Sequence, residues 1–332
     1  MPARRVIGVD LGGTKLLAGA VDRQLGVHHR LSRAVAGMGQ RELLDAAAEA
    51  VLQAIDQGEE RAAAVGFGVP ALIDPGSGSV AVGAHTPLSG IAFAQTMAER
   101  VGLPVFVDND GNLAALAEHR AGAARGADHA IVLTLGTGIG AGLILDGRLY
   151  RGARGAAGEL GHMEIDIDGE PDVDNCPGRG CAELFVSGPA LEREAARLAA
   201  DHPASALGRA AAEGRPLAGP LVTELAHDGD FAAIEAVTIV AQRLGIVIAS
   251  LINVFNPEVV VVGGGLIAAG ELLLGPAREL VARRTFPFVH ERLRILPARF
   301  GAEAGMIGAA ALAWDGLAAG GAQGAPGAEV VA

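Results

Sequence analysis

Glycine-rich turns at the ends of apolar strands constrain this chain more than any other feature of its sequence. The chain has 49 glycines among 332 residues, about twice the usual share of roughly 7%. They gather where apolar runs end and follow no collagen-like period. The order strand, glycine turn, strand occurs at residues 6–21 and again at residues 130–145. This pattern predicts an α/β chain with two lobes, each beginning with the same unit.

The boundaries of the lobes are predicted from where these units begin. We expect a small N-terminal lobe at residues 1–125 and a larger C-terminal lobe at residues 126–316. A last helix near residues 304–315 is expected to pack back on the N-terminal lobe. The Gly/Ala-rich segment 317–332 is expected to be a disordered tail.

Charge and composition exclude several classes of protein. The 26 Lys and Arg residues against 38 Asp and Glu residues give a net charge of −12, which argues against a nucleic-acid partner. The apolar stretches at 244–255 and 259–269 are each shorter than the roughly 18 residues of a membrane span. The apolar run 6–9 is too short for a signal peptide, and two cysteines are too few for a disulfide framework. We expect a cytoplasmic protein with no membrane partner.

The two glycine turns are candidate phosphate sites. The first follows Asp10, and its Gly12 and Gly13 permit positive φ, so backbone N–H groups can converge on an anion. An ordinary hairpin turn is the alternative. The second turn, residues 136–140, is not a dinucleotide fingerprint, because Ala141 stands at its sixth position. Together the two turns suggest a cleft that holds one nucleotide from both sides.

Two further strand ends carry candidate binding residues. Asn109 and Asp110 follow an apolar strand, at the edge where α/β sheets place ligands; a helix N-cap is the alternative for this pair. The glycines at 263–265 follow a buried strand and would let a flat ring approach the backbone. A helix-entry turn is the alternative there.

A carboxylate, an imidazole and two thiols follow the second turn. Glu159 and His162 lie three residues apart among glycines, and Cys176 and Cys181 lie five apart on a glycine turn. Two cysteines and a histidine in a chain otherwise free of Cys suggest zinc. The alternatives are a solvated histidine in a surface turn and two buried free thiols.

Together these motifs resemble the ROK family of sugar kinases and repressors, within the actin-like ATPase superfamily. The resemblance covers roughly residues 6–314 and depends on several ordered motifs, namely residues 9–15, 66–70, 109–110, 136–138, 158–162, 176–183 and 263–265. It implies an α/β, two-lobed actin-like ATPase (ribonuclease H-like) fold with a cleft between the lobes. It also implies a homodimer or homotetramer.

The resemblance further implies a hexose kinase that uses ATP and Mg²⁺, with glucose as the first choice of substrate. Asp110 would be the general base on the sugar hydroxyl. The other sugar-binding residues implied are Asn109, Glu159, His162 and Glu183. The nucleotide-binding residues implied are Asp10, Gly12, Gly13, Thr14, Lys15, Gly136, Thr137, Gly138, Gly263, Gly264 and Gly265, with Asp10 near Mg²⁺.

The family's structural zinc would be held here by His162, Cys176 and Cys181, with Asp174 in the place of a family cysteine. Pro177 replaces a family glycine in the same loop. Ala71 replaces another glycine near the expected sugar pocket, which leaves the sugar open.

Several alternatives to a glucokinase stay open. The sugar could be fructose, mannose, N-acetylglucosamine or N-acetylmannosamine, and the phosphate donor could be polyphosphate. A sugar-responsive repressor is disfavoured, because the phosphate strand begins at Val6 and leaves no room before it for a DNA-binding domain. A non-catalytic sugar-binding regulator is disfavoured because Asp110 and both glycine turns are retained.

Overall fold

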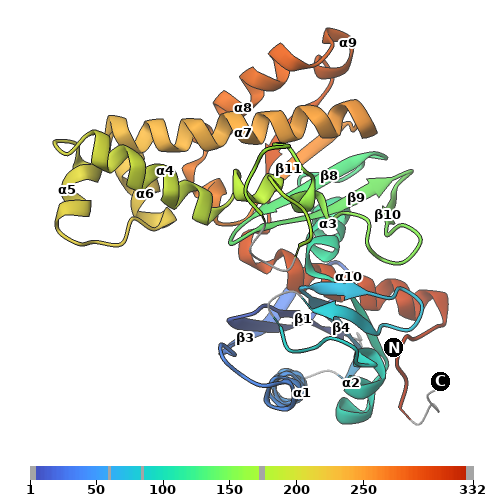
Figure 1. Ribbon diagram of the computed structural model, residues 1–332. Helices are drawn as coiled ribbons and strands as arrows, with labels where there is room; N and C mark the ends of the chain where they lie inside the picture. Colours follow the sequence, from blue (N-terminus) through green and yellow to red (C-terminus); the bar gives the residue numbers. More distant parts are fainter. Residues whose placement is uncertain (1–4, 59–60, 84–85, 172–175, 327–332) are drawn as a thin grey trace.

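The computed structural model describes residues 5–58, 61–83, 86–171 and 176–326. These residues form two lobes, each built on a five-stranded sheet (Figure 1). In Figure 1 the N-terminal lobe, with the blue and cyan strands, lies below the C-terminal lobe, with the green strands and the yellow and orange helices.

The N-terminal sheet has the strand order β3-β2-β1-β4-β7. Its first three strands form an antiparallel meander, and β1, β4 and β7 run parallel. The strands are β1 (Arg5–Leu11), β2 (Lys15–Val21), β3 (Val27–Ala34), β4 (Ala62–Val69) and β7 (Val105–Asn109). The helices α1 (Gln40–Asp56) and α2 (Phe93–Val101) and the short pair β5 (Ala71–Ile73) and β6 (Val80–Gly83) complete this part.

The C-terminal sheet repeats the same topology in the order β10-β9-β8-β11-β12. Again three antiparallel strands are followed by two parallel ones. The strands are β8 (Ala130–Leu135), β9 (Ile139–Leu145), β10 (Arg148–Tyr150), β11 (Val259–Gly263) and β12 (Arg294–Pro297). The predicted recurrence of strand, glycine turn and strand is therefore confirmed as β1–β2 and β8–β9.

Helices of the C-terminal lobe cover its sheet and extend away from it (Figure 1). They are α4 (Gly188–Asp201), α5 (Ala206–Ala212), α6 (Gly219–His227), α7 (Phe231–Phe255), α8 (Glu271–Arg284) and α9 (Pro287–His290). Short 3₁₀ turns lie at Leu160–His162, Ala182–Leu184, Gly265–Ala269 and Gly301–Glu303. Among the residues that the structure describes, α7 alone is long and apolar enough to cross a membrane, and 56% of its most apolar window is buried inside the protein, as in a core helix.

The burial of the strands follows from their place in the sheets. Every residue of β11 is buried, as are the last six residues of β4, because helices cover both faces of parallel strands. The edge strand β3 instead alternates between half-buried and exposed residues, as expected where one face meets water.

Two helices, α3 (Asp110–Ala121) and α10 (Ala304–Ala319), lie at the junction of the lobes. Glycines let them approach their neighbours closely. An ideal Cβ on Gly66 would lie 1.8 Å from the carbonyl oxygen of Ala309, and one on Gly308 would lie 1.8 Å from that of Leu113. The first contact places α10 on β4 of the N-terminal sheet, and the second packs it against α3. Helix α3 also packs against β8 and β9 of the C-terminal sheet.

The expectation of a disordered tail from residue 317 is wrong for residues 317–326. Helix α10 continues to Ala319, and Gly324 forms an antiparallel bridge with Val105 of the edge strand β7. The Gln323 side chain accepts a hydrogen bond from the Val107 N–H at 2.5 Å and donates one to the Pro75 carbonyl at 2.9 Å. Glycine-rich composition predicted disorder, but the unpaired edge of β7 offers this segment backbone partners. Residues 327–332 lie outside the described residues.

Candidate functional site

The candidate site begins where the parallel strands of the N-terminal sheet end. In the parallel register Asp10 of β1 pairs with Gly68 of β4, and Gly68 pairs with Asp108 of β7. The carboxyl ends of these strands therefore meet at one edge, where open α/β sheets bind ligands. Asp110 follows directly, as the first residue of α3.

Asp10 and Asp110 interact through their charges. Burial raises the pKa of Asp10 to about 7; the charge of Asp110 raises it too, while Lys15 opposes the shift. Burial also raises the pKa of Asp110, although a hydrogen bond from the Gly111 N–H to Oδ1 (2.9 Å) lowers it. An ideal Cβ on Gly305 would lie 2.6 Å from Cγ of Asp10, so α10 needs glycine beside this carboxylate.

Glu159, His162 and Glu183 of the C-terminal lobe form a cluster. The His162 Nε2 lies 3.8 Å from Oε2 of Glu159, and its Nδ1 lies 3.9 Å from Oε1 of Glu183. Burial raises the pKa of Glu159; His162 lowers it, while Asp110 and Glu183 raise it. The structure thus brings three predicted sugar-binding residues of this lobe together, and one of them, Glu159, feels the charge of Asp110.

Glu183 also contacts the second glycine turn. Its Oε2 accepts a hydrogen bond from the Ile139 N–H at 3.2 Å. An ideal Cβ on Gly138 would lie only 2.5 Å from the same oxygen. Glycine is therefore required at 138 by the carboxylate beside it, and the phosphate turn and the sugar cluster share one contact.

Neither Gly12 nor Gly13 has a left-handed conformation in the first glycine turn, although both residues permit one. Instead the Gly12 N–H donates to the Lys15 carbonyl at 3.0 Å, which closes a tight turn between β1 and β2. Residues 13–15 are exposed, and Gly136 and Gly138 also lack positive φ. Positive φ is therefore not what these four glycines contribute to the two turns.

Gly264, in the third glycine segment, does have positive φ, at 80°. An ideal Cβ on it would lie 2.4 Å from both the N and O atoms of Leu135. Residues 263–265 therefore pass directly beside the start of the 136–138 turn. The structure brings these two candidate nucleotide segments together at the ends of the neighbouring parallel strands β8 and β11.

Asn109 fulfils the role of a helix N-cap. Its Oδ1 accepts a hydrogen bond from the Asn112 N–H at 3.1 Å, and its Nδ2 donates to the Ala71 carbonyl at 3.3 Å. These bonds fix the amide beside Asp110. Ala71, where the resembled family has glycine, therefore contacts one of the predicted sugar-binding residues through its backbone.

The ion pair between Asp108 and Arg151 was not predicted from the sequence. Asp108 is buried, and it accepts hydrogen bonds from the Asn109 N–H (2.8 Å), the Asn112 Nδ2 (2.9 Å) and the Arg151 Nε (2.6 Å). Arg151 follows β10, so this ion pair ties the strand that leads to Asp110 to the loop that leads to Glu159. No local pattern could pair two residues 43 positions apart; a third polar residue in the run 108–110 was the only signal.

The candidate metal ligands His162, Cys176 and Cys181 have ligand atoms that all lie within 4.8 Å of one another. The two Sγ atoms are 3.7 Å apart, and the Gly178 N–H donates to the Sγ of Cys176 at 3.4 Å. An ideal Cβ on Gly178 would lie 3.1 Å from the Sγ of Cys181, so glycine leaves room around the sulfurs. Two thiols and an imidazole fit zinc. Asp174, the predicted fourth ligand, lies outside the described residues.

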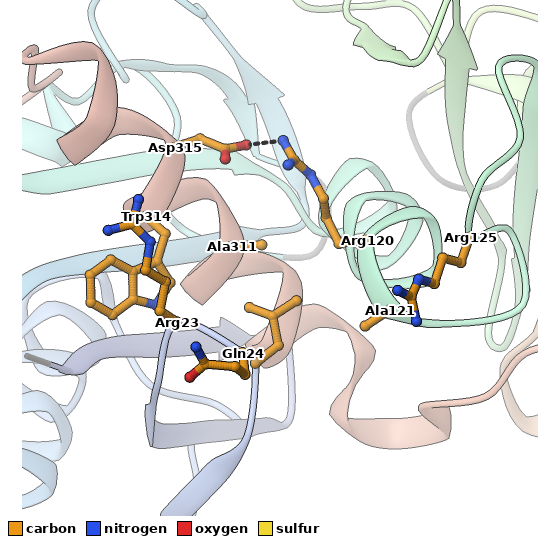
Figure 2. Close-up of a pocket in the computed structure, with 9 residues that line it drawn as sticks. Arg23, Gln24, Arg120, Ala121, Arg125, Ala311, Trp314 and Asp315 are labelled. Atoms are coloured by element: carbon orange, nitrogen blue, oxygen red, sulfur yellow. Dashed lines mark hydrogen bonds and ion pairs between the residues drawn. The ribbon is translucent and has the colours of Figure 1, made fainter. Parts of the chain in front are cut away.

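A separate cavity of about 390 Å³ shares no residue with this cluster (Figure 2). Figure 2 shows Arg120, Ala121 and Arg125 on one side of it and Ala311, Trp314 and Asp315 of α10 on the other. Two of its three guanidinium groups already have partners, because Arg120 pairs with Asp315 at 2.7 Å and Arg23 lies over the Trp314 ring. This cavity marks the outer side of the connection between the lobes.

Comparisons with known proteins agree with this geometry. The model of the ROK family matches residues 6–315. A glucokinase of Thermotoga maritima is 34% identical over 314 residues, which are 94% of this chain and 98% of that protein. The structure of a ROK family glucokinase from Streptomyces griseus in complex with glucose and AMPPNP is 34% identical, with a TM-score of 0.84 over 94% of this chain and 100% of that one.

A ROK family transcriptional regulator, a homologue of the E. coli MLC protein, is also similar. It is 27% identical, with a TM-score of 0.84 over 94% of this chain and 78% of that chain. The likeness to the ROK glucokinase structure confirms the predicted two-lobed actin-like ATPase fold.

Proposed function

Because this chain belongs to the ROK family, we propose that it is a cytoplasmic hexose kinase that transfers a phosphoryl group from ATP, with glucose as its first substrate. The observation that supports this most is the cluster of Glu159, His162 and Glu183, in which Glu159 interacts through its charge with Asp110. Carboxylates and an imidazole near one half-buried carboxylate can bind the hydroxyls of a neutral sugar. The two similar glucokinases support the choice of glucose.

In the proposed mechanism Asp110 is the general base. Its carboxylate takes the proton of a sugar hydroxyl as that oxygen bonds to the γ-phosphorus, and the bond from phosphorus to the ADP oxygen breaks. Burial raises its pKa, which makes the carboxylate a stronger base, and a positioned base contributes about 10²–10⁴ in rate. The Gly111 N–H holds one oxygen of the base in place.

The remaining sugar ligands in this proposal are Asn109, Glu159, His162 and Glu183. The N-cap bonds of Asn109 and the bond from the Ile139 N–H to Glu183 fix two of these side chains before the sugar arrives. Preorganised contacts of this kind reduce the entropy that binding costs.

The nucleotide site is proposed to include Asp10, residues 12–15, residues 136–138 and residues 263–265. The open space around Gly265 and the close contact of Gly264 with Leu135 fit a flat adenosine beside the backbone. Mg²⁺ neutralises phosphate charge in such reactions, and the carboxylate of Asp10 is the hard oxygen ligand that Mg²⁺ prefers.

Zinc is proposed to be a structural ion held by His162, Cys176 and Cys181, with Asp174 as the fourth ligand. Since His162 also faces Glu159 and Glu183, one ring nitrogen could bind the metal while the other donates to a carboxylate. We further propose that the lobes comprise residues 1–125 with α10 and residues 126–303, and that the protein is a homodimer or homotetramer.

A coupled ADP-release assay with Mg·ATP tests the proposed function. The panel holds glucose, fructose, mannose, N-acetylglucosamine and N-acetylmannosamine, with polyphosphate as a second donor. One sugar turned over well above the rest supports the kinase and identifies its substrate. Turnover of none of them by folded protein would contradict it.

A non-catalytic sugar-binding regulator is the second candidate, favoured by the similarity to the ROK transcriptional regulator. It predicts a sugar-dependent rise in Tm with no release of ADP. The same purified protein serves for both measurements, so one set of experiments separates the two candidates.

A further inference from the structure

The chain passes between the lobes twice, and the two crossovers lie against the same helix. Residues 122–129 lead from the end of α3 to β8, and residues 298–303 lead from β12 back to α10. Any rotation of one lobe against the other must bend both segments. The groups that hold them therefore decide how the lobes move.

The Glu118 carboxylate, near the end of α3, holds both crossovers. This side chain is fully buried, at 0% exposure. Its Oε2 accepts a hydrogen bond from the Ala123 N–H of the first crossover at 2.8 Å. Its Oε1 accepts bonds from the Arg299 N–H at 2.8 Å and the Phe300 N–H at 2.9 Å, both in the second crossover.

Backbone groups take the place of a cation beside this carboxylate. Within the described ranges, no Lys, Arg or His side chain forms an ion pair with Glu118. Buried charge without a partner is costly, whereas three N–H groups can stabilise a carboxylate. The position is also shaped around the side chain, because an ideal Cβ on Gly122 would lie 2.1 Å from Oε2.

Other bonds close the same junction. The Arg299 Nη1 donates to the Ala121 carbonyl at 2.8 Å, which ties the second crossover to the end of α3. On the solvent side Arg120 of α3 pairs with Asp315 of α10 (Figure 2). Exposed pairs of this kind contribute little, so the buried carboxylate is the principal tie.

Helix α3 connects this junction to the proposed base. Asp110 is its first residue, and Glu118 follows two turns later, about 12 Å along the helix axis at 1.5 Å per residue. The helix packs against α10 and against β8 and β9, so it contacts both lobes. A change in how the crossovers lie against α3 would therefore move Asp110 relative to Glu159 and Glu183.

We propose that Glu118 is a positioning residue that joins the two crossovers into one hinge and thereby sets the place of Asp110 relative to the C-terminal lobe. The link to catalysis rests on the proposed kinase function; the hinge itself does not. Glu118 touches neither of the proposed substrates and acts through the backbone of residues 123 and 299–300.

Glu118→Gln tests the proposal with almost no change in shape. Glutamine offers one acceptor oxygen and one NH₂ donor, so it can accept from one crossover but must turn a donor toward the N–H of the other. The matched control is Glu258→Gln. The exposed Glu258, just before β11, also accepts two backbone N–H bonds, from Asp128 and His129 at the far end of the first crossover (2.8 and 3.0 Å), but its carboxylate does not join that crossover to the second one.

Amide hydrogen exchange is the first readout, since it requires no activity. In Glu118→Gln we expect exchange at residues 123 and 299–300 to be at least tenfold faster, with the sheets of both lobes unchanged. Glu258→Gln should leave residues 299–300 as in the wild type. If exchange at both crossovers is unchanged in Glu118→Gln, the proposal that Glu118 joins them into a hinge is wrong.

Kinetics are the second readout, with the sugar identified in the ADP-release assay. We expect kcat to fall about tenfold to a hundredfold, while the Kd for sugar alone and the number of sugar sites per chain stay within threefold of the wild type. A merely structural loss would lower the number of sites in proportion to kcat. A kcat within twofold of the wild type, with faster exchange, would overturn the positioning role.

Arg299→Ala keeps the proposal testable if Glu118→Gln does not fold. It removes the bond to the Ala121 carbonyl and the contact of the guanidinium with the Phe300 ring but keeps both N–H bonds to Glu118, so a smaller change in the same direction, about threefold in kcat, is expected. If Arg299→Ala leaves both the exchange rates and kcat as in the wild type, the result contradicts the proposed hinge. If no sugar is turned over, the exchange experiment still decides the hinge while the proposed kinase function fails separately.

Discussion

Neighbouring carboxyl groups of the candidate site have different surroundings. Burial raises the pKa of Asp10, Asp110 and Glu159, whereas the neighbouring Asp108 is paired with Arg151. The sequence could predict Asp110, because a carboxylate at a strand end lies at a crevice. It could not predict the partner of Asp108, since that contact joins two lobes.

Replacement of Asp110 tests its proposed role as the general base. We expect Asp110→Asn to lower kcat by about 10²–10⁴, because asparagine cannot accept the hydroxyl proton. The Kd for sugar should change little, since the amide has nearly the same shape. Steady-state kinetics and sugar titration measure the two effects, and a kcat within a few-fold of the wild type would exclude Asp110 as the base.

The raised pKa of Asp10 predicts how stability depends on pH. In the folded chain this pKa is about 7, against 3.8 for the free group. Between about pH 4 and pH 7 the folded state holds a proton that the unfolded state has lost. The stabilisation is therefore fully present below pH 4 and is lost as the pH rises to 7, by on the order of a few kcal/mol.

Asp10→Asn cannot ionise and should escape this loss. Without divalent cations, we expect the free energy of unfolding of the variant, relative to the wild type, to rise from pH 4 to pH 7 and then level off. Urea unfolding at several pH values measures the difference. Parallel stability curves for the two proteins would show that the pKa of Asp10 is not raised.

The conformations of the turns and loops were the least predictable part of the fold. The sequence predicted where the glycine turns join β1 to β2 and β8 to β9, but not why glycine stands in them. Gly12 and Gly138 lack positive φ, and at 138 the glycine makes room for Glu183. Close approach between distant segments leaves no local signature, whereas positive φ in a turn can be inferred from residue type alone.

The loop with Cys176 and Cys181 is predicted to bind a structural zinc ion. Purified protein should contain about one zinc per chain, and Cys181→Ser should lose most of it together with several degrees of Tm, because metal binding and folding are coupled. Asp168→Asn, an exposed acidic residue of the same loop, should keep the metal. Elemental analysis and thermal unfolding measure both; a metal-free wild type with full activity would contradict a structural zinc.

At the scale of the whole molecule, the repeated topology of the two sheets could be anticipated because each lobe opens with the same apolar runs and glycine turn. The packing of α10 on the first lobe could not be anticipated in the same way, because it depends on contacts between distant parts of the chain. Gly8 and Gly66 let this helix lie directly on β1 and β4, and Phe106, Ala310 and Ala313 belong to one buried cluster with Val6. The fit between this sheet face and α10 can be recognised only in the folded structure, because the residues that form it are far apart in the sequence.

A fragment test follows from this packing. Residues 5–125 alone should fail to unfold cooperatively, because the face of the sheet under α10 would be open to water. The same fragment with residues 299–326 fused before residue 5 through a flexible linker should regain a cooperative transition. Circular dichroism during thermal unfolding measures both. A cooperative transition in the shorter fragment would contradict the dependence on α10.

The placement of α10 has a consequence for how the protein is made. A ribosome releases the strands of the first lobe early, but the helix that covers them comes from the last part of the chain. At roughly 5–20 residues per second, the sheet must wait on the order of ten seconds or more with one apolar face uncovered, while the second lobe is completed. Until α10 leaves the ribosome, the exposed apolar face makes the nascent first lobe prone to aggregate and a target for chaperones.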